Sequence, residues 1–198
     1  MTGAWIFVCG PSGSGKDSVI DSARKVLGTR PGIVFARRMV TRAAHAGSDH
    51  DPVSASAFAD LLQSGGLCWH WQAHGFCYGI AGHYADAVRS GCLVIVNGSR
   101  AHVKSLPPSP ALRVIQISTD PHRLASRLLQ RGRDTAGAVA DRLARNVHFA
   151  DMQADCVILN NGELANAGRQ LADYLAGTAL PVNAAESTPH LARIRTPT

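Results

Sequence analysis

Gly10-Pro11-Ser12-Gly13-Ser14-Gly15-Lys16 comes directly after the apolar run Trp5–Cys9 and before a segment with helical spacing. The apolar run predicts a strand buried on both faces of a parallel sheet. Glycines let the backbone turn so that successive N–H groups face one anion, and the start of a helix adds positive potential. The stretch therefore predicts a phosphate-binding loop of the Walker A type, in which Lys16 reaches the β- and γ-phosphates of ATP.

The residue after Lys16 departs from this pattern. A Ser or Thr hydroxyl usually stands there and binds Mg²⁺, whereas this chain has Asp17 followed by Ser18. A carboxylate is also a hard oxygen ligand, so Asp17 could contact the metal directly or through water. Alternatively, Asp17 only stabilises the start of the helix. We favour the metal contact, with ATP and Mg²⁺ as cofactors. The predicted ATP-binding residues are Gly10, Pro11, Ser12, Gly13, Ser14, Gly15, Lys16, Asp17 and Ser18.

Short apolar runs recur along the chain, and the segments between them are long enough for crossover helices. This alternation predicts an α/β fold of the P-loop kinase type, a central parallel sheet with helices on both faces and Trp5–Cys9 as its central strand. Asp120-Pro121 is typical of a helix start. The other expected strands are Ile33–Ala36, Cys92–Val96, Leu112–Ile117 and Cys156–Leu159. The expected helices are Lys16–Leu27, Ser99–Leu106, His122–Arg131, Ala136–Ala150 and Glu163–Ala176.

Residues 37–91 follow a different pattern. Ser54 can cap a helix that runs through Gln63, Gly65-Gly66 ends it, and Leu67–Ile80 predicts a short hairpin. The hairpin contains several His and Cys residues, but their spacing matches none of the common zinc patterns, so hairpin packing is favoured over zinc. We interpret residues 37–91 as a small inserted acceptor-binding lobe within one kinase domain, residues 1–177. Residues 178–198 are expected to form a flexible tail.

Composition limits the function further. The formal charge is +6, and all but three of the 20 cationic residues are arginine, which suits bidentate contacts to phosphate oxygens. Genomic base bias explains an arginine excess equally well. The arginines are dispersed rather than clustered, so nucleic-acid binding is not expected. The five cysteines suggest buried free thiols in the cytoplasm, and no apolar stretch is long enough to predict a membrane span.

Two groups of arginines could contact phosphate. Arg37–Arg42 follows the second expected strand and suits clamping of an acceptor phosphate; a solvated basic edge is the alternative, favoured for Arg37. Arg131 and Arg133 belong to an expected arginine-rich lid, about residues 127–145, and are predicted to be catalytic together with Lys16. A closing guanidinium neutralises charge on the transferred phosphoryl group. Salt bridges on a helix surface are the alternative for the lid.

No Ser-His-Asp arrangement or carboxylate pair stands out in the sequence. An acceptor phosphate already carries anionic oxygen and needs no general base, so positioning and charge neutralisation suffice. A hydroxyl acceptor would more often need a carboxylate or histidine. The sequence therefore favours a phosphate group as acceptor.

Several motifs together resemble one family, the ribose 1,5-bisphosphate phosphokinases of phosphonate catabolism, whose members are similar to guanylate kinases. The likeness covers about residues 3–176. The motifs are Gly10–Ser18, Arg38-x-x-Thr41-Arg42, Ala46-Gly47-Ser48, Trp71-x-Ala73-His74-Gly75, Tyr78-Gly79-Ile80, Val96-Asn97-Gly98-Ser99-Arg100, Arg131-Gly132-Arg133 and Leu159-Asn160-Asn161.

The resemblance implies that ATP and ribose 1,5-bisphosphate give ADP and 5-phospho-α-D-ribose 1-diphosphate (PRPP). PRPP feeds nucleotide and cofactor biosynthesis. The expected partners are these two substrates, with no nucleic acid and no membrane, and a homodimer is left open. The residues expected to bind the acceptor are Arg38, Arg42, His74, Tyr78, Asn97, Ser99 and Arg100.

Guanylate kinase, or another nucleoside monophosphate kinase, is the main alternative. Guanylate kinases carry a second arginine where this chain has His45, an acidic guanine-reading residue near Gln72, and an acidic pair on the strand that here reads Leu93–Val96. Without these carboxylates the polar edge of guanine is left unpaired, which costs ~1–3 kcal/mol. The second alternative is a non-catalytic guanylate-kinase-like binding module, against which the intact Lys16 and the lid arginines argue.

Overall fold

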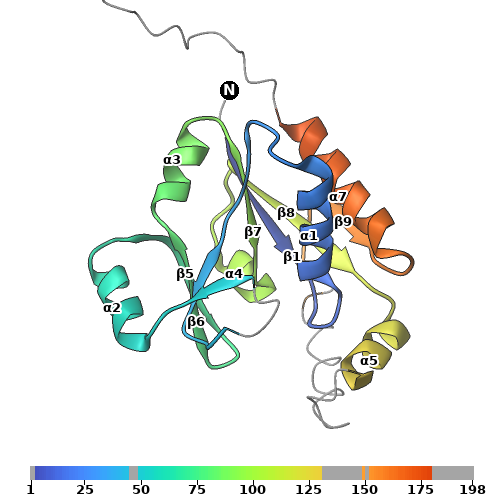
Figure 1. Ribbon diagram of the computed structural model, residues 1–198, viewed down its shortest axis with the longest axis horizontal. Coiled ribbons are helices and arrows are strands. Elements are labelled where there is room, and N and C mark those ends of the chain that lie inside the picture. The colour runs from blue at the N-terminus through green and yellow to red at the C-terminus, as the bar shows by residue number, and fades with distance from the viewer. Residues whose placement is uncertain (1–2, 45–48, 131–148, 150–151, 180–198) are drawn as a thin grey trace, which may run out of the picture.

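The computed structural model describes residues 3–44, 49–130, 149 and 152–179, and two sheets form its framework (Figure 1). The larger sheet has five parallel strands in the order β2-β7-β1-β8-β9. Its strands are β1 (Ala4–Cys9), β2 (Ile33–Phe35), β7 (Leu93–Asn97), β8 (Leu112–Ser118) and β9 (Cys156–Leu159). All five were expected from the apolar runs. β1 lies in the middle of the sheet, as predicted, and every one of its residues is buried.

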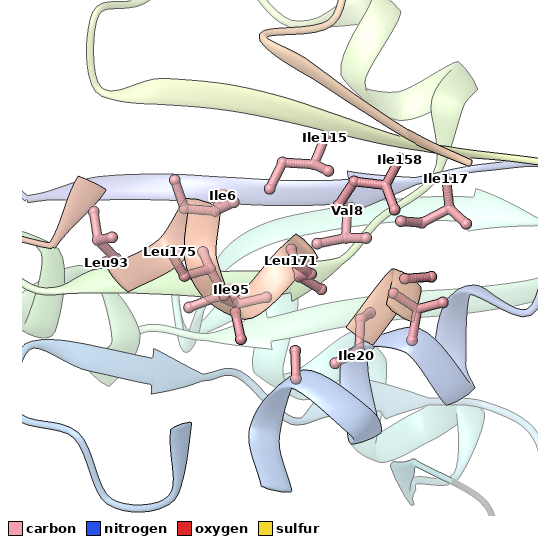
Figure 2. Close-up of a cluster of buried hydrophobic side chains, with 14 of the residues drawn as sticks. Ile6, Val8, Ile20, Leu93, Ile95, Ile115, Ile117, Ile158, Leu171 and Leu175 are labelled. Atoms are coloured by element: carbon pink, nitrogen blue, oxygen red, sulfur yellow. The ribbon is translucent and has the colours of Figure 1, made fainter. Parts of the chain in front are cut away.

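One face of this sheet is covered by α1 (Lys16–Leu27) and α7 (Leu164–Thr178), which lie side by side (Figure 1). Branched side chains of the strands meet apolar side chains of the two helices in one core. Figure 2 shows this cluster, and its labelled members are Ile6, Val8, Ile20, Leu93, Ile95, Ile115, Ile117, Ile158, Leu171 and Leu175. Such close packing fixes the carboxyl ends of the strands, where the phosphate loop begins.

The opposite face carries α3 (His83–Arg89), α4 (Arg100–Ser105) and the aromatic side of the second sheet. Trp5 and Phe7 point to this face and pack edge-on against Trp69 at 5.7 Å between ring centroids. Helices therefore cover both faces of the parallel sheet, as expected. The aromatic contacts attach the second sheet to the core.

The second sheet has the strand order β4-β3-β6-β5, and together with α2 (Ala55–Gln63) it is called the lobe from here on. The hairpin β5 (Leu67–Ala73) and β6 (Phe76–Ala81) is confirmed, and so is the cap of α2, where Ser54 Oγ accepts from Ala57 N at 3.1 Å. His74 and Gly75 form the hairpin turn with φ of 52° and 77°, as a type I′ turn requires. Sequence analysis missed α3 and two short strands, β3 (Arg38–Val40) and β4 (His50–Pro52).

The predicted start of α5 (Pro121–Gln130) is also confirmed, since Asp120 Oδ1 accepts from His122 N at 2.9 Å. All of the expected helix Ala136–Ala150 except Phe149, most of the lid and all but the first two residues of the tail lie outside the described residues. Among the helices that the structure describes, none has the length and apolar character needed to cross a membrane.

Candidate active site

The phosphate loop, Gly10–Ser18, leaves β1 at its carboxyl end and leads into α1. Gly13 and Gly15 have φ of 90° and 78°, a region that favours glycine. Glycine is also needed for space, because a Cβ at Gly10 would lie 2.6 Å from the Ile117 carbonyl oxygen and one at Gly15 would lie 2.5 Å from Asn160 Nδ2. The loop is thus a tight backbone turn packed against the ends of β8 and β9.

The first turn of α1 closes the loop. Its first hydrogen bond runs from Val19 N to Gly15 O at 2.9 Å. The N–H groups before Val19 have no carbonyl to bond within the helix, which is the general property that makes a helix N-terminus bind anions. The predicted phosphate site therefore has the backbone geometry that its sequence motif demands.

Lys16, Asp17 and Asn97 form a connected group at the mouth of the loop. Asp17 Oδ1 lies 3.3 Å from Lys16 Nζ and accepts from Asn97 Nδ2 at 2.8 Å. Burial by itself would raise the pKa of Asp17, but the charge of Lys16, the Asn97 hydrogen bond and the charge of Arg38 lower it to about 2. The Asp17 carboxylate is therefore ionised, and 63% of its side-chain surface is exposed to solvent.

Two arginines of the lobe lie over aromatic rings. The Arg38 guanidinium stands 5.8 Å from the ring centroid of Tyr78, and that of Arg42 stands 5.7 Å from that of Phe76. Burial lowers the pKa of Arg38, while the charge of Asp17 acts in the opposite direction. Within the described part of the chain, the buried Nε atoms of both arginines have no hydrogen-bond partner. The lobe thus places Arg38 within electrostatic range of Asp17, with Arg42 close enough to Arg38 to lower its pKa as well.

Arg100 brings a third cation to the same place. It opens α4 just after β7, and its guanidinium stands 4.5 Å from the ring centroid of Phe149. Burial raises the pKa of the Cys9 thiol to about 12, against the charges of Lys16 and Arg100. Cys9 ends β1, so both cations lie near the strand end from which the phosphate loop starts. The structure therefore gathers cations from the loop, the lobe and α4.

The remaining predicted residues fall in three groups. Tyr78 is buried and stacks on Trp71 at 5.4 Å, so it supports Arg38 from the lobe. Ser99 is the N-cap of α4, and His74 is exposed at the hairpin turn. The proposed catalytic residues Arg131 and Arg133 lie outside the described residues.

Sequence reasoning assigned no role to Asn160, Gly162 and Leu164, which line the other side of the phosphate loop together with Arg127 of the expected lid. A cleft of about 340 Å³ is lined by Gly13, Gly15, Ser18, Arg127, Asn160, Gly162 and Leu164. Arg127 Nη2 donates to the carbonyl oxygen of Asn160 at 3.1 Å. A signal was available, because Asn160 directly follows β9 and ligand-binding residues of parallel sheets gather at the carboxyl ends of strands.

A larger hollow of about 640 Å³ lies between α2, the edge strand β5 and α4. Trp71, which stacks on Tyr78, is one of its walls. None of the described phosphate-loop residues lines it. The larger hollow therefore borders the lobe, whereas the smaller cleft adjoins the phosphate loop.

The residues present fit ATP with Mg²⁺. The loop leaves no room for a Cβ at Gly10 or Gly15, and a backbone cradle of this kind holds phosphate oxygens through N–H groups. Within the described residues no group of three His, Cys, Asp or Glu side chains could hold a metal. Mg²⁺ commonly binds through one or two carboxylates with phosphate oxygens and water, which suits Asp17.

Comparisons with known proteins agree with this geometry. A guanylate kinase from Anaplasma phagocytophilum has the same fold, with a TM-score of 0.65 at 18% identity, over 91% of this chain and 88% of that chain. A ribose 1,5-bisphosphate phosphokinase from Burkholderia pseudomallei is 41% identical over 177 residues, which cover 88% of this chain and 96% of that protein. The chain belongs to the ribose 1,5-bisphosphate phosphokinase family.

A second ribose 1,5-bisphosphate phosphokinase, from Pseudomonas paraeruginosa, is 38% identical over 181 residues, or 89% of this chain and 97% of that protein. No family model matches the chain. Membership of the ribose 1,5-bisphosphate phosphokinase family makes this protein a kinase with a guanylate-kinase-like P-loop fold.

Proposed function

We propose that this protein transfers the γ-phosphoryl group of ATP to ribose 1,5-bisphosphate, giving ADP and PRPP. The observation that carries the proposal is that cations from three elements gather near the carboxyl end of β1: Lys16 and Arg38 act on the Asp17 carboxylate, and Lys16 and Arg100 act on the Cys9 thiol. Lys16 belongs to the phosphate loop, Arg38 to the lobe and Arg100 to the start of α4. Donor and acceptor phosphates both need such charge where they meet, and the named relatives of the family act on a bisphosphate.

The reaction joins two anions. An oxygen of the acceptor's 1-phosphate forms a bond to the γ-phosphorus, and the bond from that phosphorus to the β,γ-bridging oxygen breaks, so ADP leaves with the electron pair. Lys16 and the loop N–H groups hold the donor phosphates, while Arg38, Arg42 and Arg100 hold those of the acceptor. Mg²⁺, held by Asp17, would neutralise charge on the transferred group. No proton has to leave the attacking phosphate oxygen.

The residues around the lobe do not favour guanylate kinase activity. Ile95 is buried in β7, and Gln72 stands on β5 near the place where a guanine-reading acid is expected. Neither residue can offer guanine a carboxylate. Ser99 offers a hydroxyl beside Arg100, which suits the ribose hydroxyls of a sugar phosphate, while the buried Asn97 donates to Asp17.

Phosphorus NMR of the purified chain with ATP and Mg²⁺ tests the proposal. Ribose 1,5-bisphosphate, ribose 5-phosphate and GMP are offered in separate reactions. We expect diphosphate signals of PRPP with ribose 1,5-bisphosphate and far slower ATP consumption with the other two acceptors. Faster turnover of GMP would assign the lobe to nucleotides instead, and no ATP consumption with any acceptor would favour a binding module.

We further propose that the enzyme works in the cytoplasm. All five cysteines lie in the described part of the chain and are free thiols there. Free thiols persist in a reducing compartment.

A further inference from the structure

The carbonyl oxygen of Ser14, in the middle of the phosphate loop, is held by two side chains. Asn160 Nδ2 donates to it at 2.7 Å and Thr119 Oγ1 at 3.2 Å. Thr119 directly follows β8 and Asn160 directly follows β9, and all three residues are buried. Residues that follow two core strands therefore hydrogen-bond to the same peptide group of the loop.

The two hydrogen bonds to the Ser14 carbonyl also determine the direction of the Gly15 N–H. In a planar trans peptide the carbonyl oxygen of one residue and the N–H of the next point in opposite directions. Because the Ser14 carbonyl is turned toward Asn160 and Thr119, the N–H of Gly15 points to the other side of the loop. Gly15 is the N-cap of α1, and N–H groups at a helix N-terminus are available to an anion. If this peptide turned over, the loop would present a carbonyl oxygen to phosphate instead of a donor.

We infer that Asn160, assisted by Thr119, is a positioning residue that holds the Ser14–Gly15 peptide so that the Gly15 N–H faces the phosphates of ATP. The inference rests on the proposed function, since it requires the loop to bind ATP. Packing supports it, because a Cβ at Gly15 would lie 2.5 Å from Asn160 Nδ2. The Asn160 side chain thus fixes the loop by contact as well as by its hydrogen bond.

Asn160 has a competing explanation. It also lines the cleft of about 340 Å³, and within the described residues its buried Oδ1 has no hydrogen-bond partner. A side chain of this kind could contact the nucleoside of ATP directly. The two roles differ in which part of ATP should lose affinity when the residue is changed.

Isothermal titration calorimetry of the full chain distinguishes them, with ATP, inorganic tripolyphosphate and adenosine as probes. Asn160→Ala and Asn160→Leu both remove the donor without adding a charge, so we expect about tenfold weaker binding of ATP and tripolyphosphate, the worth of one hydrogen bond to a buried carbonyl. Adenosine should bind as it does to the wild type. Thr119→Val should weaken phosphate binding in the same direction but less, and it replaces the Asn160 variants if these do not fold.

Asn161→Ala is the matched control, because the Asn161 side chain accepts from Asp120 N at 2.7 Å and that bond does not involve the phosphate loop. Its binding of all three probes should match the wild type. Unchanged tripolyphosphate binding in the Asn160 variants, loss of adenosine binding to the same extent, or equal losses in Asn161→Ala would overturn the inference. A wild type that binds neither ATP nor tripolyphosphate would instead overturn the proposed function.

Discussion

The phosphate loop and the lobe hold the groups that we propose to bind phosphate in different ways. In the loop these groups are backbone N–H donors, fixed by left-handed glycines and by the bonds to Ser14 O. In the lobe they are guanidinium groups lying over the rings of Tyr78 and Phe76. The Nε atoms of these two lobe arginines have no partner in the described chain, whereas the Ser14 carbonyl has two.

This difference predicts that ATP meets donors that are already oriented, whereas the acceptor meets arginines that lack hydrogen-bond partners. The donors of the loop are oriented by the fold itself, so they are ready before ATP arrives and act on the group that is transferred. A buried donor without a partner costs ~1–3 kcal/mol, which a bound anion would recover. We therefore expect acceptor binding to stabilise the arginines of the lobe more than ATP binding stabilises the loop. Changes in the loop should reduce kcat, and changes in the lobe should mainly raise the KM of the acceptor.

The largest expected effect is that of Lys16→Ala in the loop. Because the lost charge acts on the migrating phosphoryl group, kcat should fall roughly 10²- to 10³-fold. Steady-state kinetics measure the loss, and thermal unfolding should show that the variant is folded. Lys25→Ala, an exposed position later in α1, is the matched control and should keep full activity. If Lys16→Ala retains most of its turnover, Lys16 is not catalytic.

Arg42→Ala tests the lobe. The KM for ribose 1,5-bisphosphate should rise about tenfold to a hundredfold, the worth of a charged hydrogen bond, while the KM for ATP stays close to that of the wild type. Arg37→Ala is the matched control, because Arg37 is already paired with Asp51. An increase in the KM for ATP alone would contradict the division between loop and lobe.

Asp17→Asn has a smaller effect at the boundary between the two regions. The amide keeps the shape but loses the charge, so the Mg²⁺ concentration for half-maximal rate should rise roughly tenfold. Asp21→Asn, one turn later and paired with Arg24, should leave it unchanged. A Mg²⁺ titration identical to that of the wild type would mean that Asp17 only stabilises the start of α1.

The same variant has a pH signature. The pKa of Asp17 falls from its ordinary value of 3.8 to about 2 in the folded protein, so its charge stabilises the fold above pH 3.8 and this contribution is lost as the pH falls toward 2. The difference in thermal midpoint between wild type and Asp17→Asn should be constant above pH ~5 and change progressively between pH ~5 and pH ~1, where it reaches its low-pH limit. A constant difference across the whole range would show that the carboxylate's charge does not contribute.

Local patterns in the sequence predicted most of the core. Continuous apolar runs mark strands that are buried on both faces, and α1, β9 and the caps at Ser54 and Asp120 agree with their expected positions. β3 and β4 were missed because each has only three residues and these include charged or polar ones, whereas the equally short β2 is entirely apolar. β3 and β4 are defined by their hydrogen bonds to each other and by those of β3 to β6, which lies far along the chain.

The sequence by itself determined the phosphate loop, since glycine conformations and an adjoining strand and helix are local properties that one motif encodes. Only the tertiary structure decided what surrounds that loop. Asn97 donates to Asp17 from a strand 80 residues away, and Asn160 reaches Ser14 across 146 residues. No local pattern records such contacts, because they depend on which strands become neighbours when the sheet assembles. The sequence motif thus identifies the phosphate loop, and the tertiary structure adds the residues from distant strands that contact it.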